Sequence, residues 1–161
     1  MTIRAPEEAD DSPSIRPAER ADLLAVLSIE NASFAQPWPY DAFDRLLGEP
    51  GFLVAERNGR IAGYVVSNVT PTAARRLGHI KDIAVHPDHR GEGIGSALLS
   101  RAIAVLTAHG ADTVKLEVRR SNEGAKRLYR EFDFEPLRLV PGYYADDEDA
   151  IVMVRKLEGA V

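Results

Sequence analysis

Three glycines at alternate positions, Gly91, Gly93 and Gly95, give this chain a segment that a ligand can approach closely. They follow the predicted strand 80–85 and open a segment with helical spacing of apolar residues. Glycine has no Cβ, and the first turn of a helix offers unpaired N–H groups and a positive dipole end. Such an arrangement favours a pyrophosphate ligand. Tight packing of a strand against the following helix is the alternative explanation.

The spacing in this loop excludes a P-loop and disfavours a dinucleotide fingerprint. A P-loop needs a Lys followed by Ser or Thr at the helix start, whereas Gly95 is followed by Ser and Ala. The pattern G-x-G-x-x-G also fails, because Ser96 lies three residues after Gly93 and Leu98 three after Gly95. What remains is R-x-x-G-x-G, formed by Arg90, Gly93 and Gly95.

Glu117 and Tyr129 carry side chains that could transfer protons. Glu117 lies on the charged side of the alternating segment 113–119, where a carboxylate is ordinarily a solvated charge. Tyr129 shares a helical stripe with Ala125 and Phe132, where it is ordinarily a core residue. Neither residue identifies an active site on its own.

Aromatic residues gather in two loops. Phe34, Pro37 and Trp38 lie in a segment stiffened by proline, which is typical of a binding wall, although Phe34 and Trp38 could equally cap the core. Tyr143 and Tyr144 follow a Pro-Gly turn near the C-terminus. We expect these two loops to enclose a narrow slot.

A metal site is not expected. His86 and His89 lie close together, but no nearby carboxylate and histidine set completes a zinc site. The acidic run 146–149 predicts a solvated loop, and attraction of a basic peptide is its second interpretation.

The apolar periodicity predicts a mixed α/β domain. Asn58 and Gly59 favour a tight primed turn between two strands. We expect helices over 18–32, 41–47 and 94–109 and one capped by Ser121 or Asn122, and strands over 52–55, 61–69, 80–85, 113–119, 134–140 and 150–157.

Length and composition narrow the function classes. The chain has 161 residues, 45% hydrophobic and 28% charged, which fits one soluble domain. A net charge of -5 argues against direct binding of nucleic acid. The absence of cysteine rules out disulfides, thiolate metal sites and a cysteine nucleophile.

Residues 1–13 are acidic and contain proline, so we expect a flexible tail before a single domain at 14–158. No apolar run is long enough to cross a membrane, and we expect a cytoplasmic protein.

The order of these motifs resembles that of the GNAT superfamily of acetyl-CoA-dependent N-acyltransferases, and within it the RimI-type N-terminal acetyltransferases. The resemblance covers about residues 15–157 and implies a mixed, mostly antiparallel sheet of about seven strands, splayed between the fourth and fifth, with about four helices. The segments that carry it are Ile83-Ala84-Val85-His86-Pro87, Arg90 to Ser96, Leu116-Glu117-Val118-Arg119, Ser121-Asn122, Leu128-Tyr129, Tyr143-Tyr144-Ala145-Asp146 and Glu148-Asp149-Ala150.

The resemblance implies acetyl-CoA as co-substrate and no metal. Loop amides would hold the pyrophosphate, and the strand backbone would pair with the pantetheine arm, which Asn122 also touches. Glu92 brings a negative charge into this loop, so its side chain is expected to point to solvent. The implied cofactor contacts are Ile83, Ala84, Val85, Arg90, Gly91, Glu92, Gly93, Ile94, Gly95, Ser96, Asn122 and Tyr129.

The resemblance also assigns the catalytic roles. Glu117 matches the general base that removes a proton from the amine, and Tyr129 matches the general acid that protonates the departing thiolate. A strand amide near Val85 would meet the oxyanion. At Asp133 the family usually has glycine, so Asp133 is expected to adopt a left-handed conformation.

The expected acceptor is the N-terminal α-amine of a protein or peptide. A terminal amine is on the order of 10% neutral at pH 7, against about 0.04% for lysine. In the resembling family, segments matching Phe34, Pro37, Trp38, Tyr143 and Tyr144 grip the first peptide residues, and we expect small first residues such as Ala or Ser. Two alternatives stay open: acetylation of a small amine (a polyamine, amino acid or aminoglycoside) and a non-catalytic acyl-CoA-binding module. We expect a monomer or weak dimer, and a ribosomal protein is a candidate substrate.

Overall fold

A single seven-stranded sheet organises residues 12–157, which are the residues that the computed structural model describes. The strand order is β1-β2-β3-β4-β5-β7-β6, and every neighbouring pair is antiparallel except β4 and β5. The strands are β1 (Ser14–Pro17), β2 (Gly51–Arg57), β3 (Arg60–Pro71), β4 (Arg76–Val85), β5 (Thr113–Arg119), β6 (Glu135–Val140) and β7 (Ala150–Lys156).

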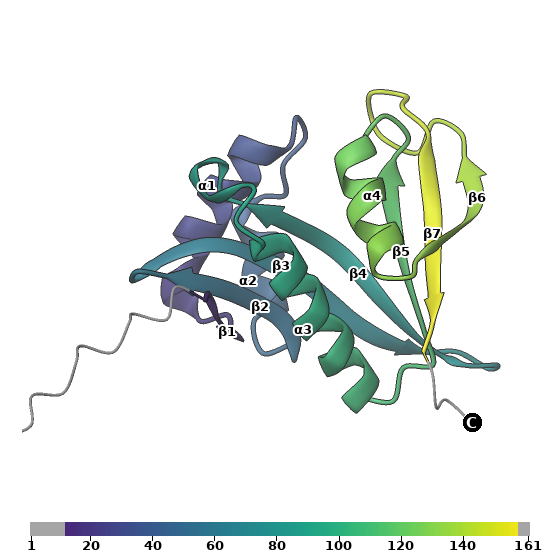
Figure 1. The fold of residues 1–161 in the computed structure, drawn as a ribbon, viewed down its shortest axis with the longest axis horizontal. Coiled ribbons are helices and arrows are strands. Elements are labelled where there is room, and N and C mark those ends of the chain that lie inside the picture. The colour runs from purple at the N-terminus through teal and green to yellow at the C-terminus, as the bar shows by residue number, and fades with distance from the viewer. Residues whose placement is uncertain (1–11, 158–161) are drawn as a thin grey trace, which may run out of the picture.

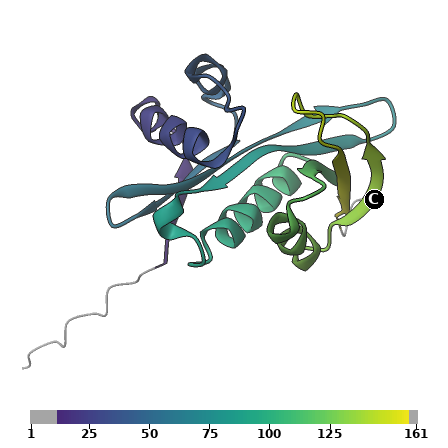
Figure 2. The same ribbon diagram turned by 90° about the horizontal axis from the view of Figure 1, so that it is seen from above.

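Helices cover both faces of the sheet (Figures 1 and 2). On one face lie α1 (Leu23–Ser33) and α2 (Tyr40–Leu46), and on the other lie α3 (Ile94–Ala108) and α4 (Glu123–Glu131). Each face has its own hydrophobic core, because side chains of a strand alternate between the two faces. Among the described residues, no helix is long and apolar enough to cross a membrane.

The sheet splays open between β4 and β5. These strands pair only from Leu77 opposite Thr113 to Ile80 opposite Leu116, and then separate (Figure 1). On its other edge β4 carries a β-bulge: Ile80 and Asp82 face consecutive residues of β3, so the residue between them is extra. A bulge bends a strand and increases its twist. The bend therefore falls where the parallel pairing ends, and the predicted splay is confirmed.

Two local predictions of backbone conformation are confirmed. Asn58 and Gly59 have φ values of 52° and 75°, as a primed turn between β2 and β3 requires. Asp133 stands where the resembling family usually has glycine, and its φ is 65°. Aspartate adopts this left-handed conformation at a small energetic cost, because its short polar side chain can hydrogen-bond to the local backbone.

Some predicted boundaries were wrong. The first helix begins at Leu23, after a 3₁₀ turn at Arg20–Asp22, and not at residue 18. The Asp22 carboxylate accepts hydrogen bonds from Arg16 and from the Glu19 backbone N–H, which fixes the chain before the helix. The short strand β1 was not predicted, and β2, β3 and β4 extend beyond their apolar runs because charged residues also join the ladder. The predicted tail 1–13 lies outside the described residues except for Ser12 and Pro13.

Gly63 provides a test of how tightly the core under the splay is packed. A Cβ at this position would lie 2.8 Å from the Ala84 carbonyl oxygen and 3.0 Å from Leu98 Cδ1. We expect Gly63→Ala to lower the free energy of unfolding by about 1–3 kcal/mol, measured by urea denaturation. Gly124→Ala is the control, because a Cβ at this position would have Asn122 Oδ1 as its nearest neighbour, at 4.0 Å. Alanine in place of glycine also stabilises a helix by about 0.5–1 kcal/mol. Equal effects of the two substitutions would contradict this packing.

Candidate active site

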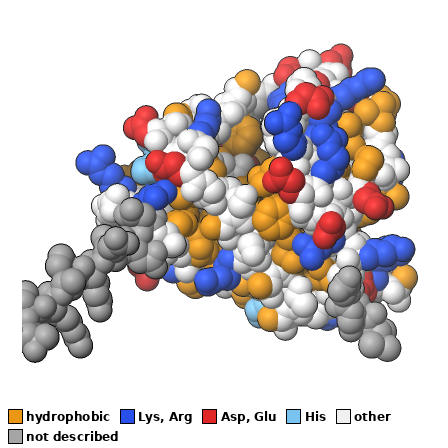
Figure 3. Space-filling view, viewed as in Figure 1, with side chains coloured by type: hydrophobic (Ala, Val, Ile, Leu, Met, Phe, Trp, Pro, Cys, Tyr) orange, Lys and Arg blue, Asp and Glu red, His pale blue; other side chains and the backbone are white. Residues whose placement is uncertain are grey.

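Two adjoining cavities open where β4 and β5 separate, and the surface is hollowed there (Figure 3). The first cavity has a volume of about 440 Å³ and lies toward α1 and the loop before β7. The second has a volume of about 680 Å³ and lies toward the glycine loop. The side chains that line both are Ser33, Phe34, Ile83, Asn122, Ala125 and Tyr129.

The second cavity gathers most of the predicted cofactor contacts. Gly91 and Gly93 have φ values of 79° and 80°, a left-handed conformation that glycine adopts without strain. Gly93 precedes the first residue of α3, so the first-turn amides of that helix start at the cavity. The predicted contacts that line it are Ile83, Ala84, Val85, Arg90, Gly91, Gly93, Ile94, Gly95, Ser96, Asn122 and Tyr129.

Glu92 is the predicted cofactor contact that does not line the second cavity. Its carboxylate lies 3.0 Å from Arg57 Nη1 and 2.9 Å from His89 Nδ1. The hydrogen bond from His89 and the charge of Arg57 lower the pKa of Glu92. The negative charge of this loop is thus turned outward and paired. Within residues 12–157, no group of three or more histidine or carboxylate side chains is arranged to hold a metal ion.

Glu117 lies on β5 and faces the first cavity with a side chain that is only 14% exposed. His79 Nε2 lies 2.7 Å from Glu117 Oε2, and Lys115 Nζ lies 3.3 Å from Oε1. Burial raises the pKa of Glu117, but the hydrogen bond to His79 and the charges of His79 and Lys115 outweigh it, so the pKa is lowered. Glu117 is therefore ionised at neutral pH and held in place, which differs from a solvated charge on a strand.

The sequence analysis did not identify His79 as a site residue. His79 lies opposite Lys115 in the parallel ladder. Glu117 follows Lys115 by two residues and therefore lies on the same side of β5. The sequence carried no signal for this contact, because it depends on the register that places His79 opposite Lys115.

Tyr129 projects from α4 to the junction of the two cavities and is 7% exposed. Its ring packs edge-to-face on Phe134 at 6.0 Å between centroids. Burial, and then the charges of Asp82 and Tyr144, raise the pKa of Tyr129. The phenol therefore keeps its proton at neutral pH, as a proton donor must.

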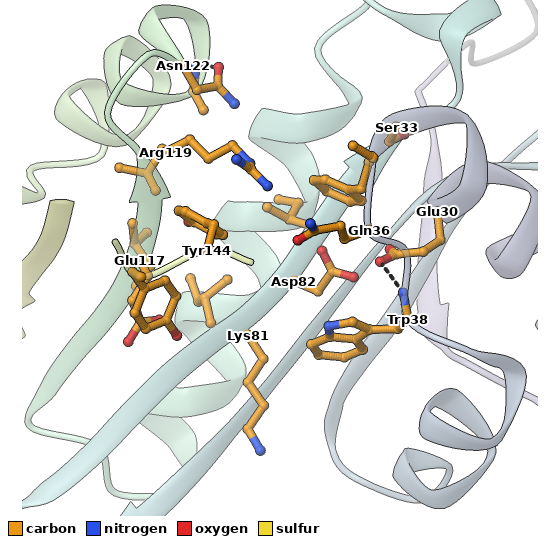
Figure 4. Close-up of a pocket in the computed structure, with 18 of the residues that line it drawn as sticks. Glu30, Ser33, Gln36, Trp38, Lys81, Asp82, Glu117, Arg119, Asn122 and Tyr144 are labelled. Carbon is orange, nitrogen blue, oxygen red and sulfur yellow. Dashed lines mark hydrogen bonds between the residues drawn. The ribbon is translucent and has the colours of Figure 1, made fainter. Parts of the chain in front are cut away.

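The aromatic slot forms as predicted, with one exception. The first cavity is lined by Phe34, Trp38, Tyr143 and Tyr144. Trp38 lies on its α1 side and Tyr144 on its β5 side (Figure 4). The two tyrosine rings meet at right angles with centroids 5.0 Å apart. Pro37 is exposed and lines neither cavity, because the turn directs it outward. Phe34 and Trp38 also pack against the core, as their alternative interpretation expected.

The acidic run 146–149 is not simply a solvated loop, which corrects that prediction. Arg119 Nη1 lies 2.8 Å from Asp146 Oδ2 and 3.0 Å from Glu148 Oε1, and its guanidinium lies 4.1 Å from the centre of the Tyr144 ring. The Ser121 backbone N–H donates to Glu148 at 2.9 Å. These carboxylates fasten the tyrosine-bearing loop to the end of β5.

Two further carboxylates, Glu30 and Asp82, face the first cavity from the opposite wall (Figure 4). Glu30 is 2% exposed and accepts a hydrogen bond from the Trp38 backbone N–H at 3.1 Å. The Tyr64 hydroxyl bonds to Glu30 and lies 3.3 Å from Asp82 Oδ2. The sequence signal for Glu30 was its place on the buried stripe of α1, four residues after Val26.

The sequence of the chain matches a known family over most of the fold just described. The model of the acetyltransferase (GNAT) family matches residues 23–134. This chain belongs to the GNAT family.

Individual GNAT proteins match the chain almost end to end. An N-alpha-acetyltransferase of Sulfolobus acidocaldarius is 35% identical over 155 residues, which cover 89% of this chain and 92% of that protein. The ribosomal protein bS18-alanine N-acetyltransferase of Escherichia coli is 34% identical over 145 residues, covering 87% and 95%. The crystal structure of Ard1 from Thermoplasma volcanium superposes with a TM-score of 0.83 at 28% identity, covering 91% of this chain and 98% of that chain.

The GNAT site of this chain has the shape that a thioester donor needs. Beyond Ile80 the edge of β4 is not paired with β5, so its backbone groups are available to an amide-containing arm. Space beside Gly91 and Gly93 is open, since a Cβ at either position would meet no atom within 4 Å. The residues present therefore fit acetyl-CoA.

Arg119 provides a test of the loop attachment. Lysine cannot form the planar guanidinium contacts to two carboxylates and a ring. We expect Arg119→Lys to speed amide hydrogen exchange at Gly142 and Tyr144 by about tenfold. This corresponds to a decrease of about 1.4 kcal/mol in the free energy of local opening of the loop. Arg120→Lys is the matched control, because the Arg120 side chain is largely exposed and lies 3.3 Å from Asp149. Equal exchange rates in the two variants would show that Arg119 does not hold the loop.

Proposed function

We propose that this protein is an acetyl-CoA-dependent N-acetyltransferase that modifies the N-terminal α-amine of proteins or peptides. The observation that carries the proposal is the splay between β4 and β5, with a glycine loop at one end, an aromatic slot at the other, and Glu117 and Tyr129 between them. The names of the relatives from Sulfolobus acidocaldarius and Escherichia coli support the same reaction.

Acetyl-CoA binds across the second cavity in this proposal. The amides from Gly91 to Ser96 hold the pyrophosphate at the start of α3, and the backbone of β4 from Ile83 to Val85 pairs with the pantetheine arm. Asn122 accepts a hydrogen bond from the Ala125 backbone N–H at 3.1 Å through its side-chain oxygen. Its contact with the arm therefore uses the amide nitrogen.

The reaction begins when the acceptor ammonium loses a proton to Glu117. The neutral amine then attacks the thioester carbonyl carbon, and a backbone N–H of β4 near Val85 stabilises the oxyanion. As the carbon–sulfur bond breaks, Tyr129 gives its proton to the leaving thiolate, and the second proton that the nitrogen loses on forming the amide restores the Tyr129 phenol. The products are an acetylated amine, coenzyme A and the proton taken by Glu117. His79 Nε2, 2.7 Å from Glu117 Oε2, holds the carboxylate in place when it takes this proton.

The slot favours the end of a peptide over an internal lysine. Phe34 and Trp38 face Tyr143 and Tyr144 across the first cavity, and these walls suit an extended backbone with a small first side chain. A terminal amine also loses its proton more readily than lysine. A ribosomal protein is the first substrate to test, because the Escherichia coli relative is named for one.

Substitution of the two proton-transfer residues tests the mechanism. We expect Glu117→Gln and Tyr129→Phe each to lower kcat by about 100-fold, because positioned acid–base groups contribute this much, while coenzyme A binding stays within about threefold. Turnover and calorimetric binding of coenzyme A are the measurements. Unchanged turnover in either variant would remove that residue from the mechanism.

A peptide panel tests the acceptor. We expect free peptides that begin with Ala or Ser to be acetylated at the α-amine, and the same peptides with a blocked N-terminus to be inert even when they contain lysine. Mass spectrometry of the products distinguishes the two positions. Equal acetylation of blocked peptides, or a lower KM for small amines than for peptides, would refute the proposed function.

A further inference from the structure

The Glu30 and Asp82 carboxylates differ from the other acidic side chains of the active site, because no cation accompanies them. Glu117 lies beside Lys115 and His79, and Glu148 beside Arg119. In the described part of the chain, neither Glu30 nor Asp82 has an ion pair.

Two cationic side chains do line the same cavity, and both are directed elsewhere. The Lys81 ammonium points away from the pair (Figure 4). Arg119 is bound to Asp146 and Glu148 on the opposite wall. The negative charge on the α1 side of the slot is therefore uncompensated within the described residues.

The hydrogen bonds of Glu30 explain how such a charge persists. The carboxylate accepts from the Trp38 backbone and from the Tyr64 hydroxyl, and both donors are neutral. Burial, and then the adjacent Glu30, raise the pKa of Asp82, so this carboxyl group retains a proton at neutral pH. The two side chains together then carry one negative charge.

We propose that Glu30 and Asp82 supply the counter-charge that draws the acceptor's α-ammonium group into the slot and positions it before Glu117 removes the proton. This inference rests on the proposed function, since every protein N-terminus that enters the cavity brings one positive charge. The two residues are positioning residues and take no part in bond making.

The attraction between two opposite charges in a partly buried site is strong enough for this role. One unit charge acting on another across several ångströms of a poorly hydrated cavity changes affinity by about tenfold or more. Glu30 and Asp82 line the same cavity as Glu117 and Tyr129, so the charge of the pair acts on a group held at the reaction centre. An ammonium group between these walls would compensate a charge that the free protein leaves unpaired.

The experiment compares a peptide beginning with Ala against its des-amino analogue, which differs only in lacking the α-ammonium group. Calorimetry with coenzyme A present measures both dissociation constants for the wild type, for Asp82→Asn, and for Glu30→Gln/Asp82→Asn. Asp82→Asn is the matched control, because it imitates the protonated carboxyl group and keeps the Glu30 charge. The double variant has nearly the same shape but no charge.

We expect the wild type and Asp82→Asn to bind the amino peptide about tenfold more tightly than the analogue, and the double variant to bind both equally. The double variant should also raise the peptide KM by about tenfold without lowering kcat or changing the KM for acetyl-CoA. Its Tm should not fall below that of the wild type, since a buried charge without a cation is removed.

A tenfold preference that survives in the double variant would overturn the inference, as would loss of the preference in Asp82→Asn alone. Equal binding of both peptides by the wild type would overturn it without any variant. If the wild type still acetylates peptide α-amines in that case, the proposed function stands. If the wild type acetylates no peptide, the proposed function fails and the inference fails with it.

Discussion

The end of parallel pairing between β4 and β5 is the constraint on which the rest of the site depends. Four residue pairs hold the strands together, and the bulge at Lys81 then turns β4 away. A continuous ladder would close the space that the two cavities occupy and would use the backbone groups that face it. The positions of Asp82 and Glu117 are therefore set by their distance along β4 and β5 from this point.

The charges around the splay are arranged unequally. On the β5 wall, Glu117 has cationic or histidine partners at both oxygens, which keep it ionised and fixed. On the α1 wall, Glu30 and Asp82 have only neutral donors and each other. The β5 wall thus carries a paired and fixed carboxylate, and the opposite wall carries two carboxylates with no cation partner among the described residues. Buried polar groups that do not optimise stability are expected where a protein binds its substrate.

Local sequence signals predicted the scaffold well, and the resemblance supplied Glu117 and Tyr129 as the proposed proton-transfer pair. The Asn58-Gly59 turn, the glycine loop and the left-handed Asp133 follow from backbone preferences that neighbouring residues decide. The contact of His79 with Glu117, two residues 38 positions apart, did not follow, because it depends on the register of β4 against β5. The proximity of Glu30 to Asp82 depends likewise on how α1 packs against the sheet.

The unpaired stretch of β4 would give bound acetyl-CoA a second role, in the stability of the fold. Strand edges with free N–H and C=O groups are where chains aggregate, and here one lies in the middle of a sheet. A pantetheine arm on Ile83 to Val85 would take the place of the missing ladder. A ligand that binds only the folded state also shifts the equilibrium away from unfolding. The lifetime of this protein in a cell would then rise and fall with the supply of its own acyl donor.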